Sequence, residues 1–216
     1  MRPTVPAAAA RSIGPVVLAA GLFGPLFILK RFGPLDFWWS MAVSVTAVAA
    51  AAFLTDGSYA RILASDLRGG VVRKVILGIG SSALLYIFFL TGDFLSRTIL
   101  PFAASGIDHI YSFKAGASAG RIALLMTLII GPGEEIFWRG FLQRNWQAGF
   151  GKTPGFLAAA GFYTLVHLGS GNVMLIAAAA VCALFWGAIY TRYRSVLLVA
   201  VSHTIWDLAV FLIRPF

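Results

Sequence analysis

One stretch decides how this chain folds: residues 122–140, IALLMTLIIGPGEEIFWRG. It is long and apolar, yet it holds the only two glutamates of the chain, Glu134 and Glu135, side by side. Arg139 follows Glu135 by four residues, which is about one helical turn. A charge in the hydrocarbon interior of a membrane costs about 3 kcal/mol or more, so acids there point to function. The stretch therefore predicts a membrane-embedded helix that carries chemistry.

The composition supports a membrane protein. Hydrophobic residues make up 59% of the 216 residues and charged residues only 12%, and the mean hydropathy is +0.86. Soluble domains contain about a quarter charged residues, so too little polar surface is left here to solvate a globule. We predict an all-α fold, a polytopic transmembrane helical bundle.

Apolar runs long enough to cross a bilayer, which takes roughly 20 residues, recur along the whole chain. We expect about seven to eight spans, seven of them at residues 13–29, 37–54, 75–91, 122–138, 156–168, 173–190 and 196–213. Residues 95–111 form an eighth short span, a re-entrant piece or a surface helix. Residues 56–74 read as an amphipathic connection. We expect one membrane domain, with N-terminal spans in 1–118 and a catalytic core in 119–216.

The net charge of +9 does not indicate nucleic-acid binding. The basic residues stand singly at the edges of apolar runs, where side chains reach lipid headgroups, so membrane lipid is the expected anionic partner. Seven spans with the N-terminus inside put ten basic residues on the inner side: Arg2, Arg11, Arg61, Arg68, Arg73, Lys74, Arg144, Lys152, Arg192 and Arg194. The outer side then has six: Lys30, Arg31, Arg97, Lys114, Arg121 and Arg214.

The first apolar run reads as a retained span, because no small-residue cleavage site follows it; Lys30 and Arg31 come next. The single cysteine, Cys182, lies inside an apolar run. It excludes an intrachain disulfide and a thiolate metal cluster, and we interpret it as a core residue. His109, in the interrupted segment, reads as an interfacial or loop residue.

The spacing of the charged residues favours a division of roles. Positions i and i+4 share a helix face, so Arg139 would neutralise and orient Glu135. Glu134 points about 100° away and is left for a reacting group, as a general base. Pro132, with glycines on both sides, is expected to interrupt the helix and admit water. A buried structural ion cluster is the alternative.

Two of the three histidines follow in later apolar runs. His167 comes one turn after Tyr163, and His203 shares a helix face with Asp207 at i+4. Asp207 could fix the tautomer of His203 or help to bind an oxyanion. An ordinary helix–helix hydrogen-bonding role is the alternative for each histidine.

These three motifs, EExxxR, an aromatic residue followed at i+4 by His, and HxxxD, resemble those of the CPBP family. Its members are the CAAX proteases and bacteriocin-processing enzymes, also called the Abi family of intramembrane proteases. The resemblance covers residues 122–211. It implies that Glu134 and His167 activate water, that His203 and Asp207 stabilise the oxyanion, and that Glu135 and Arg139 support the site.

The chain departs from the family pattern at two positions. Tyr163 stands where Phe is common, and Asp207 stands where Asn is common. An ionised Asp cannot donate a hydrogen bond to an oxyanion. Asp207 is therefore either protonated or used to orient His203.

We predict an integral-membrane endopeptidase that cleaves a peptide bond of a membrane-associated peptide or membrane-anchored protein with glutamate-activated water. No cofactor is expected to be required, although Glu134, His167 and His203 could bind a Zn-like divalent metal. A membrane carrier and a non-catalytic binding scaffold are the alternative functions. The expected location is the cell membrane, multi-pass, of a bacterium, because the content of Ala, Gly and Arg is high. The sequence leaves the substrate and the oligomeric state open.

Overall fold

The chain is helical throughout the part that the structure describes. The computed structural model describes residues 5–216, so Arg2 lies outside the described residues. The N-terminal half contains α1 Val5–Ala10, α2 Ile13–Leu29, α3 Phe37–Thr55, α4 Tyr59–Arg68, α5 Val71–Ile99, α6 Ala103–Tyr111 and the 3₁₀ turn η1 Ser112–Lys114. The C-terminal half contains α7 Ala119–Leu125, η2 Met126–Ile130, α8 Gly131–Glu135, η3 Ile136–Gln143, α9 Arg144–Phe150, α10 Lys152–Val166, η4 His167–Ser170, α11 Val173–Tyr193, α12 Val196–Leu208 and η5 Ala209–Ile213.

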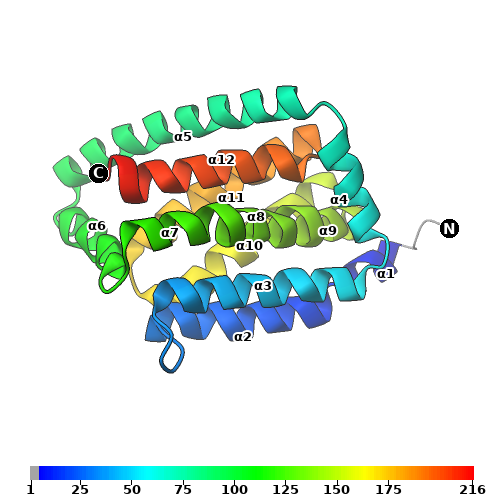
Figure 1. Cartoon of the computed structure of the whole chain (residues 1–216), viewed down its shortest axis with the longest axis horizontal. Helices are drawn as coiled ribbons and strands as arrows, with labels where there is room; N and C mark the ends of the chain where they lie inside the picture. The colour runs from blue at the N-terminus through cyan, green and yellow to red at the C-terminus, as the bar shows by residue number, and fades with distance from the viewer. Residues whose placement is uncertain (1–4) are drawn as a thin grey trace.

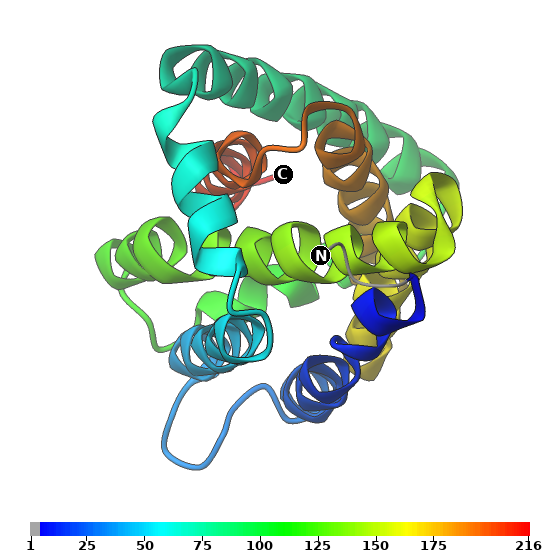
Figure 2. The same ribbon diagram turned by 90° about the vertical axis from the view of Figure 1, so that its right-hand side faces the viewer.

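The long helices lie side by side and run between two ends of the molecule (Figure 1). The segments α7 to α9 form one continuous helical run, Ala119–Phe150, which we call the central rod. Figures 1 and 2 show the rod between α2 and α3 on one side and α5 and α12 on the other. The loop between α2 and α3, helix α6 and the C-terminus lie at one end, and α1 and α4 lie at the other (Figure 1).

The predicted all-α membrane bundle is confirmed. Among the described residues, five helices are long and apolar enough to cross a membrane: Ala8–Leu29, Phe37–Thr55, Val71–Ile99, Val173–Tyr193 and Val196–Ile213. A sixth span is possible if Ala103–Lys114 and Ala119–Phe150, which are bent by 89° relative to each other, count as one. Helix α10, with 15 residues, covers most of the predicted span 156–168 but is shorter than the roughly 20 residues that a crossing takes, so it is not one of these five.

The ambiguous segment 95–111 is divided between two helices. Its first residues complete the 29-residue helix α5, and the rest forms α6, which has nine residues. At about 1.5 Å per residue, a helix of nine residues is too short to cross a bilayer. Of the three alternatives, an independent eighth span is therefore wrong.

The first apolar run is built into the bundle as α2. Phe23, Leu26 and Phe27 are buried, and Phe27 packs its ring 4.3 Å from that of His167, measured between centroids. The aromatic contact ties the start of the chain to a predicted site residue far away in the sequence.

The expected helix break at Pro132 is wrong, because the rod continues through it. The π-helical turn η2 precedes Pro132 and ends with a bond from Gly131 N–H to the carbonyl of Met126. A wider turn of this kind accommodates a residue that lacks an N–H and would otherwise clash with the preceding turn. The flanking glycines serve close packing: a Cβ on Gly131 would meet Thr204 Oγ1 at 2.3 Å, and one on Gly133 would meet a methyl of Val45 at 2.4 Å.

Buried apolar side chains form two clusters that meet at the rod. The larger joins α2, α3, the rod and α10, and it includes Phe23 and Phe137. The smaller joins α5, α11 and α12 around Leu85 and Trp186. Helix α8, which carries both glutamates, contacts α3 and α12, and its position places the glutamates between the clusters.

Asp56 ties the connection between α3 and α4 to the end of the rod. It accepts hydrogen bonds from the backbone N (3.0 Å) and Oγ (2.6 Å) of Ser58, and it forms an ion pair with Arg144. Burial alone would raise the pKa of Asp56, but the bonds from Ser58 and the charge of Arg144 outweigh it and hold this pKa below its ordinary value.

We expect Asp56→Asn to lower the free energy of unfolding at neutral pH by about 1–3 kcal/mol, since Arg144 loses its partner. A lowered pKa contributes stability above the unfolded value, about 4, and loses it as the pH falls through the folded value. The difference between wild type and variant should therefore shrink on acidification. Thermal unfolding in detergent between about pH 3 and 7 measures it.

Asp36→Asn is the matched control. Asp36 pairs with Arg121, but the side chains of both are more than a quarter exposed, so we expect a loss of about 1 kcal/mol or less. Equal losses from the two variants would contradict the structural role given to Asp56.

Candidate active site

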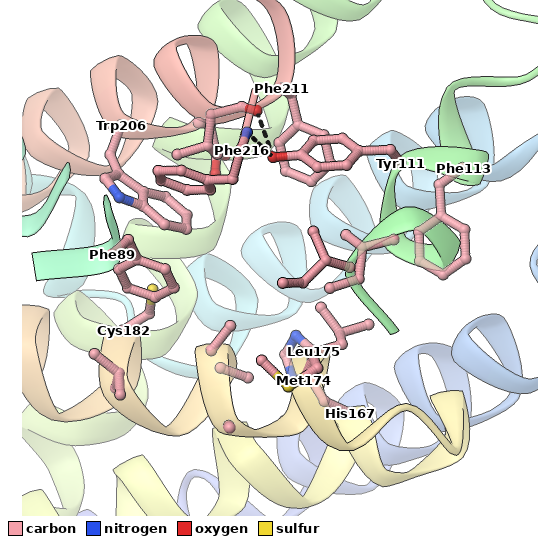
Figure 3. A pocket seen from close by; sticks show the side chains of 18 of the residues that line it. Phe89, Tyr111, Phe113, His167, Met174, Leu175, Cys182, Trp206, Phe211 and Phe216 are labelled. Atoms are coloured by element: carbon pink, nitrogen blue, oxygen red, sulfur yellow. Dashed lines mark hydrogen bonds between the residues drawn. The ribbon is translucent and has the colours of Figure 1, made fainter. Parts of the chain in front are cut away.

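A cavity of about 430 Å³ lies among α5, α6, the rod, α10, α11 and α12, and its walls are mostly apolar and aromatic (Figure 3). Figure 3 shows Phe89, Trp206 and Phe211 on one side of it and His167 on the other. The polar side chains of the predicted motifs that line it are Glu134, Tyr163, His167, His203 and Asp207. Three helical segments far apart in the sequence therefore deliver their polar groups to one apolar chamber.

Glu135 does not line the cavity but holds the helices behind it together. Its side chain is fully buried, and its Oε1 accepts a bond from Arg139 Nη1 at 2.8 Å and lies 2.7 Å from His203 Nδ1. Its other oxygen, Oε2, is buried without a hydrogen-bond partner in the described structure. We call Glu135, Arg139 and His203 the ion cluster; it joins the rod to α12.

Arg139 is enclosed by aromatic rings. Its guanidinium carbon lies 4.8 Å from the ring centre of Tyr163 and 5.5 Å from that of Trp186, and its Nη2 donates to the carbonyl of Cys182 at 3.4 Å. Cation–π contacts of this kind offset part of the cost of removing a guanidinium from water. Cys182 itself is buried, as predicted.

Glu134 faces the cavity from the same turn of helix. It is 4% exposed, and Tyr163 Oη donates a hydrogen bond to its Oε2 at 3.2 Å. Within residues 5–216, it forms no ion pair with a basic side chain. The two neighbouring glutamates thus occupy different surroundings, one neutralised by cations and one open to the cavity.

His167 lies on the cavity wall at the end of α10. Its Nδ1 is 2.7 Å from the carbonyl oxygen of Tyr163, which can only accept. In the neutral ring the proton is therefore on Nδ1, and Nε2 keeps its lone pair. The ring packs against Tyr163 at 4.8 Å between centroids, in addition to its contact with Phe27.

His203 is clamped between two carboxylates and a ring. Trp186 stacks on it with 3.9 Å between centroids and 26° between planes. Its Nδ1 meets Glu135, and its Nε2 lies 3.4 Å from Asp207 Oδ2. The second contact is the longer and the weaker of the two.

The structure brings together the six predicted site residues: Glu134, Glu135, Arg139, His167, His203 and Asp207. Four line the cavity, whereas Glu135 and Arg139 lie behind it. The sequence did not indicate the bond between Glu135 and His203, the bond from Tyr163 to Glu134, or the stacking of Trp186. His109 is outside the site; its ring nitrogen is 2.7 Å from Lys30 Nζ at an exposed position.

The side chains do not fit the divalent-metal alternative. Among the described residues, no group of three or more His, Cys, Asp or Glu side chains converges as a metal site would require. Both nitrogens of His203 already face carboxylates, and Nδ1 of His167 faces a carbonyl. No step below is routed through a metal.

The family resemblance is confirmed by comparison. Residues 118–209 match the family model described as "Type II CAAX prenyl endopeptidase Rce1-like", and all three motifs fall within this range. No curated protein and no solved structure matches the chain. The family match supports an intramembrane endopeptidase, a hydrolase embedded in a membrane.

The ion cluster predicts unequal effects of the two glutamates on stability. Glu135→Gln leaves Arg139 buried without a carboxylate, and we expect it to lower the free energy of unfolding by about 3–5 kcal/mol. Glu134→Gln removes a carboxylate that no cation balances and keeps an acceptor for Tyr163, so we expect little loss. Thermal unfolding of the two variants in the same detergent compares them.

The two substitutions make the same chemical change at adjacent positions, so each serves as the control for the other. A loss with Glu134→Gln as large as that with Glu135→Gln would show that the two carboxylates share one structural role.

Proposed function

We propose that this chain, whose residues 118–209 carry the Rce1-like CAAX endopeptidase match, hydrolyses a peptide bond with water activated by Glu134. The observation that supports this most is the contrast between two adjacent glutamates. Glu135 is satisfied by Arg139 and His203, while Glu134 opens onto the cavity with only a tyrosine hydroxyl on it. A carboxylate with free acceptor capacity in an apolar chamber suits a general base.

The first step takes place at Glu134. Its carboxylate accepts a proton from a water molecule, and the water oxygen forms a bond to the carbonyl carbon of the substrate. The Nε2 lone pair of His167 is a second acceptor on the same cavity, and it would orient that water. The carbonyl oxygen then carries the negative charge, and the protonated Glu134 can return the proton to the leaving amine as the C–N bond breaks.

His203 is suited to the developing oxyanion. In its imidazolium form both ring nitrogens donate, and Nδ1 is already occupied by Glu135. His203 lines the cavity, and its Nε2 has only the 3.4 Å contact with Asp207. A substrate oxyanion could displace this weak contact, since a charge-assisted bond prefers a shorter distance. Before substrate binds, Asp207 orients His203 through this contact, and it need not be protonated to do so.

The substrate that fits is a membrane-associated peptide or membrane-anchored protein. The cavity wall offers aromatic and aliphatic contacts and few polar groups away from the motif residues, so it favours an apolar segment next to the scissile bond. We place the enzyme in the bacterial cell membrane, surrounded by lipid, and require no metal for the reaction.

Glu134→Gln tests the proposal. The amide keeps the shape but cannot accept the proton, so we expect turnover to fall by about 10³-fold. Protein termini mapped across the membrane proteome of cells carrying wild type or variant measure the effect. Termini created by the wild type should vanish with the variant.

Asp36→Asn is the matched control, because it makes the same change outside the cavity and should leave the termini unchanged. If the termini agree between wild type and a folded Glu134→Gln protein, under conditions in which substrates are expressed, a carrier or scaffold becomes the better account.

Tyr163 gives a second test, specific to this chain. Its hydroxyl is the hydrogen-bond donor on Glu134 and holds Oε2 in place (3.2 Å), while its backbone carbonyl holds His167. Tyr163→Phe removes only the hydroxyl. A bond to a charged group contributes about 1.5–3 kcal/mol, so we expect kcat to fall roughly tenfold while KM changes little.

Tyr190→Phe controls for loss of a buried phenolic hydroxyl, since Tyr190 is buried and does not line this cavity. Kinetics with a cleavable reporter peptide identified from the mapped termini would measure both variants. A rise in KM without a fall in kcat would contradict a role of Tyr163 in positioning the base.

A further inference from the structure

Trp186 of α11 restrains the face of the His203 ring. Its indole is fully buried and stacks on the imidazole with 3.9 Å between centroids and 26° between planes. The polar contacts of the imidazole are Nδ1 to Glu135 and Nε2 to Asp207. When a substrate displaces the contact with Asp207, the ring is free to pivot about its bond to Glu135. The stacked indole is then the restraint that keeps the plane of the ring in place.

A chain of hydrogen bonds runs from Trp186 to helix α5. Trp186 Nε1 donates to Ser202 Oγ at 3.1 Å, and Ser202 Oγ lies 2.9 Å from Ser81 Oγ. Ser81 Oγ is in turn 3.0 Å from the carbonyl oxygen of Gly78, which can only accept. Each hydroxyl has one proton, so Ser81 donates to Gly78 and Ser202 donates to Ser81. We call Trp186, Ser202 and Ser81 the indole–serine chain.

Close packing of α5 against α12 brings the two hydroxyls together (Figure 1). A Cβ on Gly78 would meet Cγ1 of Val201 at 2.7 Å and the carbonyl oxygen of Leu198 at 3.0 Å, so the absence of a side chain permits this approach. Ser81 lies nearly one helical turn after Gly78, and Ser202 follows Val201. Ser202 is fully buried, where a polar group without a hydrogen-bond partner is costly. The interface therefore favours the bonded arrangement of these groups.

From these contacts we infer that Ser81 and Ser202 are positioning residues of the active site. They fix Trp186 over His203 and thereby aim the imidazole at the developing oxyanion. Their effect on catalysis rests on the proposed function, whereas their effect on the orientation of His203 does not. Ser81 belongs to α5, which lies outside the matched residues 118–209. A helix that the family match does not cover thus takes part in the site.

Ser81→Ala tests the inference, and Ser82→Ala is its matched control. Both substitutions remove one hydroxyl from adjacent positions of α5, but Ser82 Oγ donates to the carbonyl of Ile79 in its own helix, at 2.8 Å. Ser81 is 121 positions away from Ser202 in the sequence. A change at His203 in Ser81→Ala is therefore not an effect of a sequence neighbour, as it could be in Ser202→Ala.

Nuclear magnetic resonance of the full chain in detergent, with ¹⁵N-labelled tryptophan and histidine, gives the first measurement. The chain has six tryptophans and three histidines, so few signals overlap. Trp186→Phe and His203→Gln assign the two signals of interest. We expect Ser81→Ala to shift both the indole N–H signal of Trp186 and the imidazole signals of His203, and Ser82→Ala to shift neither.

Three results would overturn the inference: unchanged signals in Ser81→Ala, a shift at Trp186 without one at His203, or equal shifts from Ser81→Ala and Ser82→Ala. Ser81 is only half-buried, so its substitution by Ala is expected to leave the chain folded. None of these readings requires activity. They test the positioning of His203 even where Glu134→Gln leaves the protein termini unchanged and the proposed function fails.

Kinetics with the reporter peptide give the second measurement. Since one hydrogen bond of the chain is lost, we expect the kcat of Ser81→Ala to fall roughly two- to fivefold while KM changes little. In a Trp186→Phe background, which lacks the indole N–H, Ser81→Ala should have no further effect, because it acts through that group. A purely structural hydroxyl would lower the unfolding temperature at constant kcat. Such a result, or an equal fall of kcat in both backgrounds, would overturn the inference.

Discussion

The buried ion cluster is the interaction on which the rest of the site depends. Glu135 Oε1 meets Arg139 within the rod and His203 of α12 at the same time, so one oxygen fixes the position of two helices. Buried charges are costly unless they are paired, and the desolvation of a pair can exceed its attraction. We therefore interpret the contribution of the ion cluster as geometric. By joining the rod to α12, the cluster fixes the positions of Glu134 and His203 on the cavity wall.

Aromatic rings pack against the members of the ion cluster. Trp186 stacks on His203, and Tyr163 lies against the guanidinium of Arg139 while it donates to Glu134. The rings exclude water from the ion pair and leave the cavity side of Glu134 open. Tyr163 therefore links the structural and the reactive glutamate, since it contacts the partner of the first and hydrogen-bonds the second.

Features within one helix could be predicted from the sequence, and contacts between helices could not. The pairs Glu135 with Arg139 and His203 with Asp207 follow from i,i+4 geometry, and the structure contains both. The bond between Glu135 and His203 joins residues 68 positions apart, and no periodicity encodes it. The predicted break at Pro132 was wrong because it considered only the local effect of a proline on a helix. In the structure the rod packs against α3 and α12, and a π-helical turn before Pro132 lets the helix continue.

The two departures from the family pattern can be explained together by the charges on the site. Tyr163 adds a donor at Glu134, and Asp207 places an acceptor beside His203, where Asn would offer a donor as well. The first stabilises a negative charge on the base, and the second favours a positive charge on the imidazole. Tyr163 thus acts at Glu134 on one side of the cavity, and Asp207 acts at His203 on the other. A transition state that moves negative charge from Glu134 to the carbonyl oxygen gains from an imidazolium donor that is already in place at His203.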